Sequence, residues 1–328
     1  MFKLEKIKSK DVKRVCMAHT VYTLLQYLLI SSEEEIKHTY FFLATTLNER
    51  ICAFFPNKYV LYGVKAPVLM RPFRLLQKLF FMWTRNFRWS FLKQAEIYGL
   101  DHAAIFFPLL YKTNFIQLED GFGTYNPPKE ASLSAKLLGF PVEKQWGRSP
   151  YCQCRILTHE PPANSYLREK PYRKIDLQEL WQTSTPAKKA FILELFNINQ
   201  EDLDFLNRYE NILLTQCFSE DNMTSEEAKI ACYRRIIESY KLVPEKTLIK
   251  THPREKTDYE KIFPGFSVFK KQVPMELISL NTNHIKRAIT VSSTSIFMLQ
   301  NKSTEIIWCD TKFSPELKAK YGNWEIPF

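Results

Sequence analysis

The run Thr247-Leu248-Ile249, followed by KTHPRE at residues 250–255, gives the clearest indication of the fold. This short, mostly apolar run is typical of a buried strand, so His252 falls where a strand gives way to a loop. In open α/β sheets, ligands bind at that end of the strands. A histidine there can donate a hydrogen bond to a phosphate or carry a proton near neutral pH, and Pro253 fixes the backbone beside it. A His-Pro pair alone is more often structural, so its meaning depends on the rest of the chain.

Short apolar runs alternate with amphipathic stretches along the whole chain, which is the pattern of βαβ units. In the first half we expect strands at residues 15–18, 40–44, 59–63, 104–107 and 115–119, and helices at 22–31 and 133–138. In the second half we expect strands at 211–215, 247–250, 288–291 and 305–308, and helices at 186–196, 200–207, 225–240 and 294–301. Residues 151–185, with several prolines and many polar side chains, predict an irregular excursion.

This order of elements favours an α/β protein with two Rossmann-like domains that face a central cleft. We expect an N-terminal domain at 1–208, a C-terminal domain at 209–312, and a tail at 313–328 that packs back on the body. At 328 residues the chain is long enough for two domains of ordinary size.

The composition is that of a folded protein with an anionic partner. Hydrophobic residues make up 45% of the chain, with 25 Phe and 16 Tyr, which argues against disorder. The formal net charge is +11, so a nucleic acid, an anionic membrane surface or a sugar nucleotide could each be that partner.

The seven cysteines show no zinc-binding pattern, because Cys152 and Cys154 are two apart and the others are scattered. An odd count with no signal peptide predicts a reducing cytoplasm. The apolar run at residues 21–30 is about half of a membrane span, so an integral membrane protein is not expected.

An acid pair lies in LEDGFGTY, at residues 118–125, directly after a predicted strand. Adjacent carboxylates at a strand end suit proton abstraction, with Glu119 or Asp120 taking the proton while the other orients it. Gly121 lets the backbone approach a ligand closely. The alternative is a tight turn whose acids are merely solvated.

A hydroxyl-rich segment, VSSTS at 291–295, follows another predicted strand and opens a helix-like run. Hydroxyls and free backbone N–H groups at the start of a helix can bind an anion. Ordinary capping explains one hydroxyl but not all four, so phosphate binding is a candidate role for Ser292, Ser293, Thr294 and Ser295.

A third segment, at the end of the strand predicted over 211–215, offers Thr215, Gln216 and the second candidate base, Asp221. The alternative, for Asn222 to Ser225, is a polar loop that caps the next helix. By contrast, Asp202 and Asp204 lie in a helical stretch where side chains two apart diverge, so we expect no metal site there.

Residues 65–93 carry basic side chains interleaved with aromatic ones and contain no acid. The basic residues are Lys65, Arg71, Arg74, Lys78, Arg85, Arg88 and Lys93. This mixture suits a helix on anionic lipid, and it could also bind single-stranded nucleic acid. A packed helix with a solvated basic face is the third possibility.

Together, these segments resemble the bacterial lipooligosaccharide sialyltransferases of glycosyltransferase family 52. The related bacterial polysialyltransferases share three motifs, which correspond here to Glu119-Asp120-Gly121, His252-Pro253 and Ser292-Ser293-Thr294, in the same order. The stretches AHTVYTLLQYLL at 18–29 and ILLTQ at 212–216 are also similar to family 52. The resemblance implies the glycosyltransferase-B type of fold.

The resemblance further implies an inverting, metal-independent enzyme that uses CMP-N-acetylneuraminate as donor and needs no cofactor. His252 would stabilise or protonate the departing phosphate, and residues 292–295 would hold it. Asp120 or Glu119 would deprotonate the acceptor hydroxyl, with Asp221 as rival. Arg254 would meet the carboxylate of the donor.

The implied acceptor is a galactose-ended or sialylated glycan, lipid-linked, in lipooligosaccharide or capsule synthesis. The expected location is the cytoplasm, peripherally at the inner face of the bacterial membrane through residues 65–93. Extension of sialic acid chains and the use of another nucleotide sugar remain alternatives within this class. A basic nucleic-acid-binding protein is the alternative from another class, although no nucleic-acid motif is present and we expect no nucleic acid partner.

Overall fold

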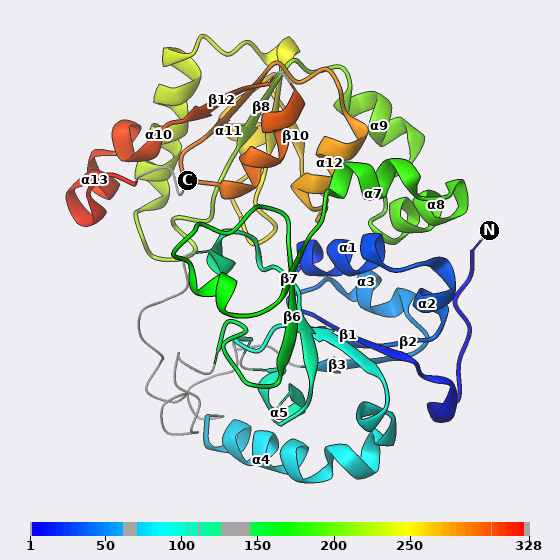
Figure 1. Ribbon diagram of the computed structural model, residues 1–328. Coiled ribbons are helices and arrows are strands. Elements are labelled where there is room, and N and C mark those ends of the chain that lie inside the picture. The colour runs from blue at the N-terminus through cyan, green and yellow to red at the C-terminus, as the bar shows by residue number, and fades with distance from the viewer. Residues whose placement is uncertain are drawn as a thin grey trace. The chain divides into compact units, whose positions relative to one another are not determined.

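A computed structural model describes residues 2–61, 71–103, 105–110, 112–125, 145–302 and 304–324. The chain divides into two compact units, Met1–Leu195 and Phe196–Phe328. Each unit contains its own parallel β-sheet with helices packed beside it (Figure 1). The functional domain bounds expected from the sequence, 1–208, 209–312 and 313–328, remain predictions.

The sheet of the first unit has the strand order β3-β2-β1-β4-β5-β6-β7, and every described pair is parallel. Its strands are β1 (Arg14–Ala18), β2 (Thr39–Ala44), β3 (Lys58–Leu61), β4 (Glu96–Gly99), β5 (Phe115–Gln117), β6 (Cys152–Leu157) and β7 (Tyr172–Lys174). The chain starts in the middle, builds outward to β3 and then returns to build the other half from β4. This is the doubly wound order of a Rossmann sheet.

The helices of the first unit are α1 (Val21–Ile30), α2 (Glu33–Lys37), α3 (Glu49–Phe54), α4 (Arg71–Arg88), α5 (Phe107–Leu110), α7 (Leu177–Thr183) and α8 (Pro186–Leu195). Figure 1 shows α1, α2 and α3 on one side of strands β1–β3, and α4 and α5 on the other. Helix α1 begins because the Thr20 side chain accepts the backbone N–H of Thr23, which satisfies one donor of the first turn. Tyr27, Leu24 and Leu28 of α1 are fully buried, so burial of this face stabilises the helix.

The second unit repeats this plan with the strand order β10-β9-β8-β11-β12, again parallel throughout its described pairs. Its strands are β8 (Asn211–Leu214), β9 (Thr247–Lys250), β10 (Ser267–Phe269), β11 (Arg287–Thr290) and β12 (Glu305–Trp308). Its helices are α9 (Gln200–Leu206), α10 (Glu226–Ser239), α11 (Tyr259–Ile262), α12 (Met275–Asn281) and α13 (Pro315–Tyr321). All four residues of β8 and of β9 are buried, as expected for parallel strands covered on both faces.

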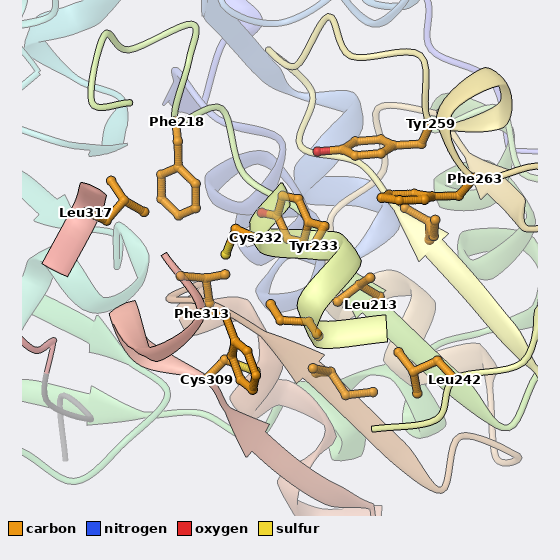
Figure 2. Packing of buried hydrophobic residues seen from close by; sticks show 14 residues of the cluster. Leu213, Phe218, Cys232, Tyr233, Leu242, Tyr259, Phe263, Cys309, Phe313 and Leu317 are labelled. Atoms are coloured by element: carbon orange, nitrogen blue, oxygen red, sulfur yellow. The ribbon is translucent and has the colours of Figure 1, made fainter. Parts of the chain in front are cut away.

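A cluster of buried apolar side chains lies between α10 and this second sheet (Figure 2). Cys232, Tyr233 and Ile236 of α10 pack there with residues of β8, β9 and β11. Leu317 of α13 is fully buried in the same cluster. The cluster fixes the strands whose carboxyl ends carry the loops described below.

Several predicted elements are confirmed with ends that agree within one residue, among them the strands at 15–18, 40–44 and 247–250 and the helices at 186–196 and 225–240. The helix predicted over 294–301 is instead a 3₁₀ segment, η8 (Thr294–Lys302). The helix predicted at 133–138 lies outside the described residues.

The strand predicted at 104–107 is wrong. Phe106 and Phe107 both donate their N–H groups to the carbonyl of Ala103, so the chain turns and enters α5. Pro108 lies in the first turn of that helix, where its missing N–H costs little, whereas it could not serve an internal strand. The strand at this place in the sheet is β4, which the sequence reasoning missed.

The prediction of an irregular excursion over 151–185 is also wrong, because this segment contains β6, β7 and α7. The prolines that suggested irregularity, among them Pro161, Pro162 and Pro171, lie between these elements rather than inside them. Their positions mark loops, as proline's lack of an N–H requires.

Within the described residues, none of the helices combines the length and the apolar character needed to cross a membrane.

Candidate functional site

In both sheets the chain changes direction between two neighbouring strands, β1 and β4 in the first unit and β8 and β11 in the second. Loops at the carboxyl ends of such strands diverge and leave room for a ligand. The residues singled out from the sequence lie in these loops or in those of the next strands.

In the second unit, one side chain links the loops on either side of this point. The Gln216 side-chain oxygen accepts hydrogen bonds from the backbone N–H and the hydroxyl of Ser292, each at 2.9 Å. Gln216 follows β8 and Ser292 follows β11, so two predicted site residues that are far apart in sequence are brought together. The backbone N–H of Ser293 donates to the Thr290 hydroxyl at 3.0 Å, and the Ser293 and Ser295 hydroxyls lie 2.9 Å apart.

Glu255, which sequence reasoning did not assign to the site, ties the His-Pro loop to the end of β8. Its side chain is 1% exposed and accepts the Thr215 hydroxyl at 2.5 Å and the backbone N–H of His252 at 3.1 Å. The Tyr259 hydroxyl donates to its other oxygen at 2.5 Å. Glu255 is the last residue of the KTHPRE segment, which could have drawn attention to it, but only the fold shows that its carboxylate is buried.

The ring of His252 is held in one tautomer. Its Nδ1 accepts the backbone N–H of Arg254 at 3.2 Å, so in the neutral ring the proton is on Nε2. Burial, with the positive charges of Arg254 and Lys250, lowers the pKa of His252 to about 4. His252 is therefore a neutral hydrogen-bond donor at physiological pH.

Arg254 and Asp221 form a two-bonded ion pair, with N–O distances of 2.6 and 2.8 Å. The hydrogen bonds from Arg254 lower the pKa of Asp221 to about 2. Asp221 is therefore a weak base in this structure. The guanidinium of Arg254, which was expected to bind the carboxylate of the donor, is paired with Asp221.

Lys229 of α10 lies beneath these loops with a fully buried side chain. Its Nζ is 3.0 Å from Glu220, 3.0 Å from Glu226 and 3.6 Å from Glu255. One cation therefore holds the loop after β8, the start of α10 and the His-Pro loop.

Replacing Lys229 with methionine is expected to lower the free energy of unfolding by about 3 kcal/mol, because the buried carboxylate of Glu255 and the largely buried one of Glu220 lose their cation. Urea denaturation measures this change. The control is Lys246→Met, since Lys246 is exposed and pairs with Glu210 at 3.6 Å, and there we expect a change within about 0.5 kcal/mol. Equal effects of the two substitutions would contradict this role of Lys229.

In the first unit, the two acids of the predicted motif have different environments. Glu119 is 2% exposed and accepts hydrogen bonds from the hydroxyls of Tyr22, Tyr125 and Thr158. Burial raises its pKa. Glu119 therefore holds the loops together, and the sequence alone did not separate this role from that of Asp120.

Asp120 is more open, with 21% of its side chain exposed. Its Oδ2 lies 2.9 Å from Nε2 of His102 and 3.6 Å from Nε2 of His19. Burial alone would raise the pKa of Asp120, but the hydrogen bond from His102 and the two nearby rings outweigh it and lower the pKa. Gly121 continues the turn with φ = 55°, a left-handed conformation that favours glycine.

His19 and His102 were not predicted as site residues. His19 directly follows the predicted strand at 15–18, which was an available signal, whereas His102 follows the missed strand β4. The ring of His102 stacks on Trp146 with centroids 3.6 Å apart and planes 3° apart. Strand ends therefore bring both histidines to Asp120 from β1 and β4.

Among the described residues, His19, His102 and Asp120 have the spacing of a possible metal site, because their ligand atoms lie within 4.8 Å of one another. The 2.9 Å contact between Asp120 and His102 is a direct hydrogen bond. Metal-bound histidines normally donate their other ring nitrogen to a partner, but Nδ1 of both rings is buried without a hydrogen bond to any described residue. The arrangement is that of a hydrogen-bonded cluster.

Comparison with known proteins agrees with this architecture. The model of glycosyltransferase family 52 matches residues 25–313. An uncharacterized protein of Haemophilus influenzae strain Rd is 32% identical over 247 residues, which is 75% of this chain and 77% of that protein.

Two solved structures match most of this chain. The GT-B domain of a sialyltransferase from Photobacterium damselae has a TM-score of 0.54 at 13% identity, covering 90% of this chain and 89% of that one. A UDP-GlcNAc 2-epimerase from Methanocaldococcus jannaschii has a TM-score of 0.49 at 13% identity, covering 96% and 95%. The first likeness confirms the predicted glycosyltransferase-B type of fold, and the matched length establishes that the chain is a glycosyltransferase belonging to glycosyltransferase family 52.

Proposed function

We propose that this glycosyltransferase moves N-acetylneuraminic acid from CMP-N-acetylneuraminate to a galactose-ended glycan, with inversion at the anomeric carbon. The observation that carries the proposal is the neutral His252 ring at the end of β9, whose Nδ1 accepts the Arg254 N–H and leaves Nε2–H as its donor. A neutral N–H can donate a hydrogen bond to the phosphate of a nucleotide sugar, and this hydrogen bond becomes stronger as negative charge grows on the phosphate.

The second unit is the proposed donor side. As the bond between the sugar and the phosphate breaks, Nε2–H of His252 would donate a hydrogen bond to the departing phosphate oxygen and stabilise the negative charge that grows on it. The hydroxyls of Ser293, Thr294 and Ser295 and the Gln216–Ser292 pair would hold the nucleotide phosphate. Arg254 could reach the donor carboxylate only by exchanging it for Asp221, its present partner.

The first unit is the proposed acceptor side, where the Asp120 cluster would take the proton of the attacking hydroxyl. Asp120 is preferred to Glu119, which is buried and fully engaged, and to Asp221, which is paired with Arg254. We propose that protein donors neutralise the phosphate and that no metal or cofactor takes part.

Calorimetric titration with CMP, UDP and dTDP tests the donor assignment. We expect CMP to bind at least about tenfold more tightly than the other two and His252→Ala to weaken it. A preference for UDP or dTDP would favour a family member that uses another nucleotide sugar. A CMP-binding enzyme that lengthens sialylated acceptors repeatedly would be a polysialyltransferase.

A lipid-linked acceptor at the inner face of the bacterial membrane is part of this proposal, as in lipooligosaccharide or capsule synthesis. Helix α4 supports it, because the large apolar side chains at its successive turns are exposed: Leu76 63%, Leu79 48%, Phe80 54%, Trp83 76% and Phe87 89%. Arg88 at its end adds positive charge. Arg85 does not, since it is buried and donates to the carbonyls of Pro108 and Leu109.

The double variant Trp83→Ser, Phe87→Ser is expected to lower binding to phosphatidylglycerol vesicles by at least about tenfold, because each large apolar side chain contributes about 1.5–3 kcal/mol when buried. Vesicle co-sedimentation measures the partition coefficient. Tyr321→Ser, at a 40% exposed aromatic of the second unit, is the control and should leave binding unchanged. If the double variant and Tyr321→Ser bind vesicles equally well, α4 does not contact the membrane.

A further inference from the structure

The loop that follows β8, residues 215–225, carries much of the proposed donor side, and we call it the β8 loop. At its start, the Gln216 side chain accepts hydrogen bonds from Ser292, which follows β11. Further along, Asp221 pairs with Arg254 of the His-Pro loop. The position of the β8 loop therefore decides where these groups stand relative to a bound nucleotide.

The middle of the β8 loop has an uncommon backbone conformation. Asn222 has φ = 56°, in the left-handed region that residues other than glycine seldom adopt. The turn is closed by a backbone hydrogen bond from the N–H of Met223 to the carbonyl of Phe218, at 2.8 Å. A strained backbone of this kind persists only where surrounding groups determine it. The neighbours of Asn222 therefore matter for the shape of the loop.

Helix α13, far along the chain, supplies such neighbours. Nζ of Lys320 donates to the carbonyls of Asn222 and Met223, at 3.2 and 3.4 Å. The hydroxyl of Thr224 donates to the carboxylate of Glu316. Because Glu316 and Lys320 are four positions apart, they lie on the same face of the helix. This face of α13 thus contacts three successive residues of the β8 loop.

The first half of the β8 loop is held by apolar packing with the same C-terminal segment, residues 310–324. Phe218 is 4% exposed and lies beside Leu317 of α13 in the buried cluster (Figure 2). Its ring also packs on that of Trp324, with centroids 5.7 Å apart. Trp324 is itself fixed, because its carbonyl accepts the indole N–H of Trp308 at 2.9 Å and its own N–H donates to Asp310. The C-terminal segment is therefore an anchored support for the loop.

The attachment of α13 to the second unit does not require its polar contacts with the loop. Leu317 is fully buried in the cluster and anchors the helix by itself. By contrast, Glu316 and Lys320 are exposed residues. Among the described residues, the hydrogen bonds of their side chains go to the β8 loop. These two side chains therefore serve the shape of the loop rather than the attachment of the helix.

We propose that Glu316 and Lys320 are positioning residues for donor binding, which hold the β8 loop in the shape that presents Gln216 and the Asp221–Arg254 pair to the nucleotide. This inference rests on the proposed function for the identity of that nucleotide, CMP. Without the two contacts the loop occupies other shapes for part of the time. The apparent dissociation constant of the nucleotide rises as the binding-competent fraction of the protein falls.

Calorimetric titration with CMP tests this role. In the double variant Glu316→Gln, Lys320→Met we expect the Kd for CMP to rise about tenfold, as for a loop that is competent in about a tenth of the molecules. The donor KM should rise by a similar factor while kcat changes by less than about twofold, because the contacts act on binding. The control is Lys318→Met, at an exposed lysine on another face of α13, which should bind CMP like the wild type.

Two failures of this experiment have different meanings. If the double variant binds CMP as tightly as the wild type does, the inference is overturned and the proposed function is untouched. A wild type that does not bind CMP overturns the proposed function.

A second measurement needs no ligand and tests the support of the loop directly. Amide hydrogen exchange followed by NMR should show the Met223 N–H exchanging at least about tenfold faster in the double variant, while the amides of α10 keep their rates. Lys320→Arg keeps a cation that can donate to both carbonyls, so its Met223 N–H should exchange like that of the wild type. An unchanged rate at Met223 in the double variant would show that α13 does not hold the loop and overturn the inference.

Discussion

His252→Ala is expected to lower kcat for transfer from CMP-N-acetylneuraminate by about 10³-fold, because it removes the hydrogen-bond donor that stabilises the departing phosphate. The loss should fall mainly on kcat, since the interaction strengthens as the phosphate departs. Steady-state CMP release measures it. His284→Ala, at an exposed histidine of the same unit, is the control. A loss below about tenfold would contradict the role given to His252.

The same substitution should also change how the free energy of unfolding depends on pH. Burial and two nearby cations lower the pKa of His252 to about 4, whereas an unfolded histidine titrates near 6.5. The unfolded chain therefore binds more protons between these pH values, and the wild-type free energy of unfolding falls as the pH falls through that window. In His252→Ala this contribution is absent, so urea titrations should show a smaller fall between about pH 6.5 and 4.

Asp120→Asn is expected to lower kcat by about 10²- to 10³-fold while the fold is retained, since asparagine has the same shape and can still accept the hydrogen bond from His102. The matched comparison is Asp221→Asn, measured in the same assay. Asp221 is paired with Arg254 and its pKa is about 2, so we expect a loss below about tenfold there. The reverse ranking would make Asp221 the base and contradict the assignment of Asp120.

The parts of this fold that the sequence predicted well are those in which local pattern and burial agree. β8 and β9 are short apolar runs buried on both faces, and Ser225 caps α10 just before two glutamates in its first turn. In these cases periodicity and capping suffice.

The errors arise where tertiary packing decides. Residues 104–107 are apolar enough for a strand, but Phe106 and Phe107 make turn bonds to Ala103, and Pro108 follows in the first turn of α5. β6 was missed because the prolines around it dominate the composition of 151–185, although they lie outside the strand.

The candidate site shows the same limit. Sequence motifs indicated Asp120 and His252, but the side chains that define the chemistry of Asp120 come from distant segments. His19 and His102 reach Asp120 only because β1, β4 and β5 are neighbours in the sheet, an order that no local pattern contains. The separation of Glu119 from Asp120 likewise depends on burial, which adjacent positions in a sequence do not reveal.

The most direct test of the central claim is the product formed from CMP-N-acetylneuraminate and lactose in the presence of a chelator, followed by mass spectrometry and CMP release. Our account predicts a sialylated lactose that is lost in His252→Ala. Absence of both sialylated product and CMP, with a glycoside formed instead from a uridine or thymidine nucleotide sugar, would contradict it.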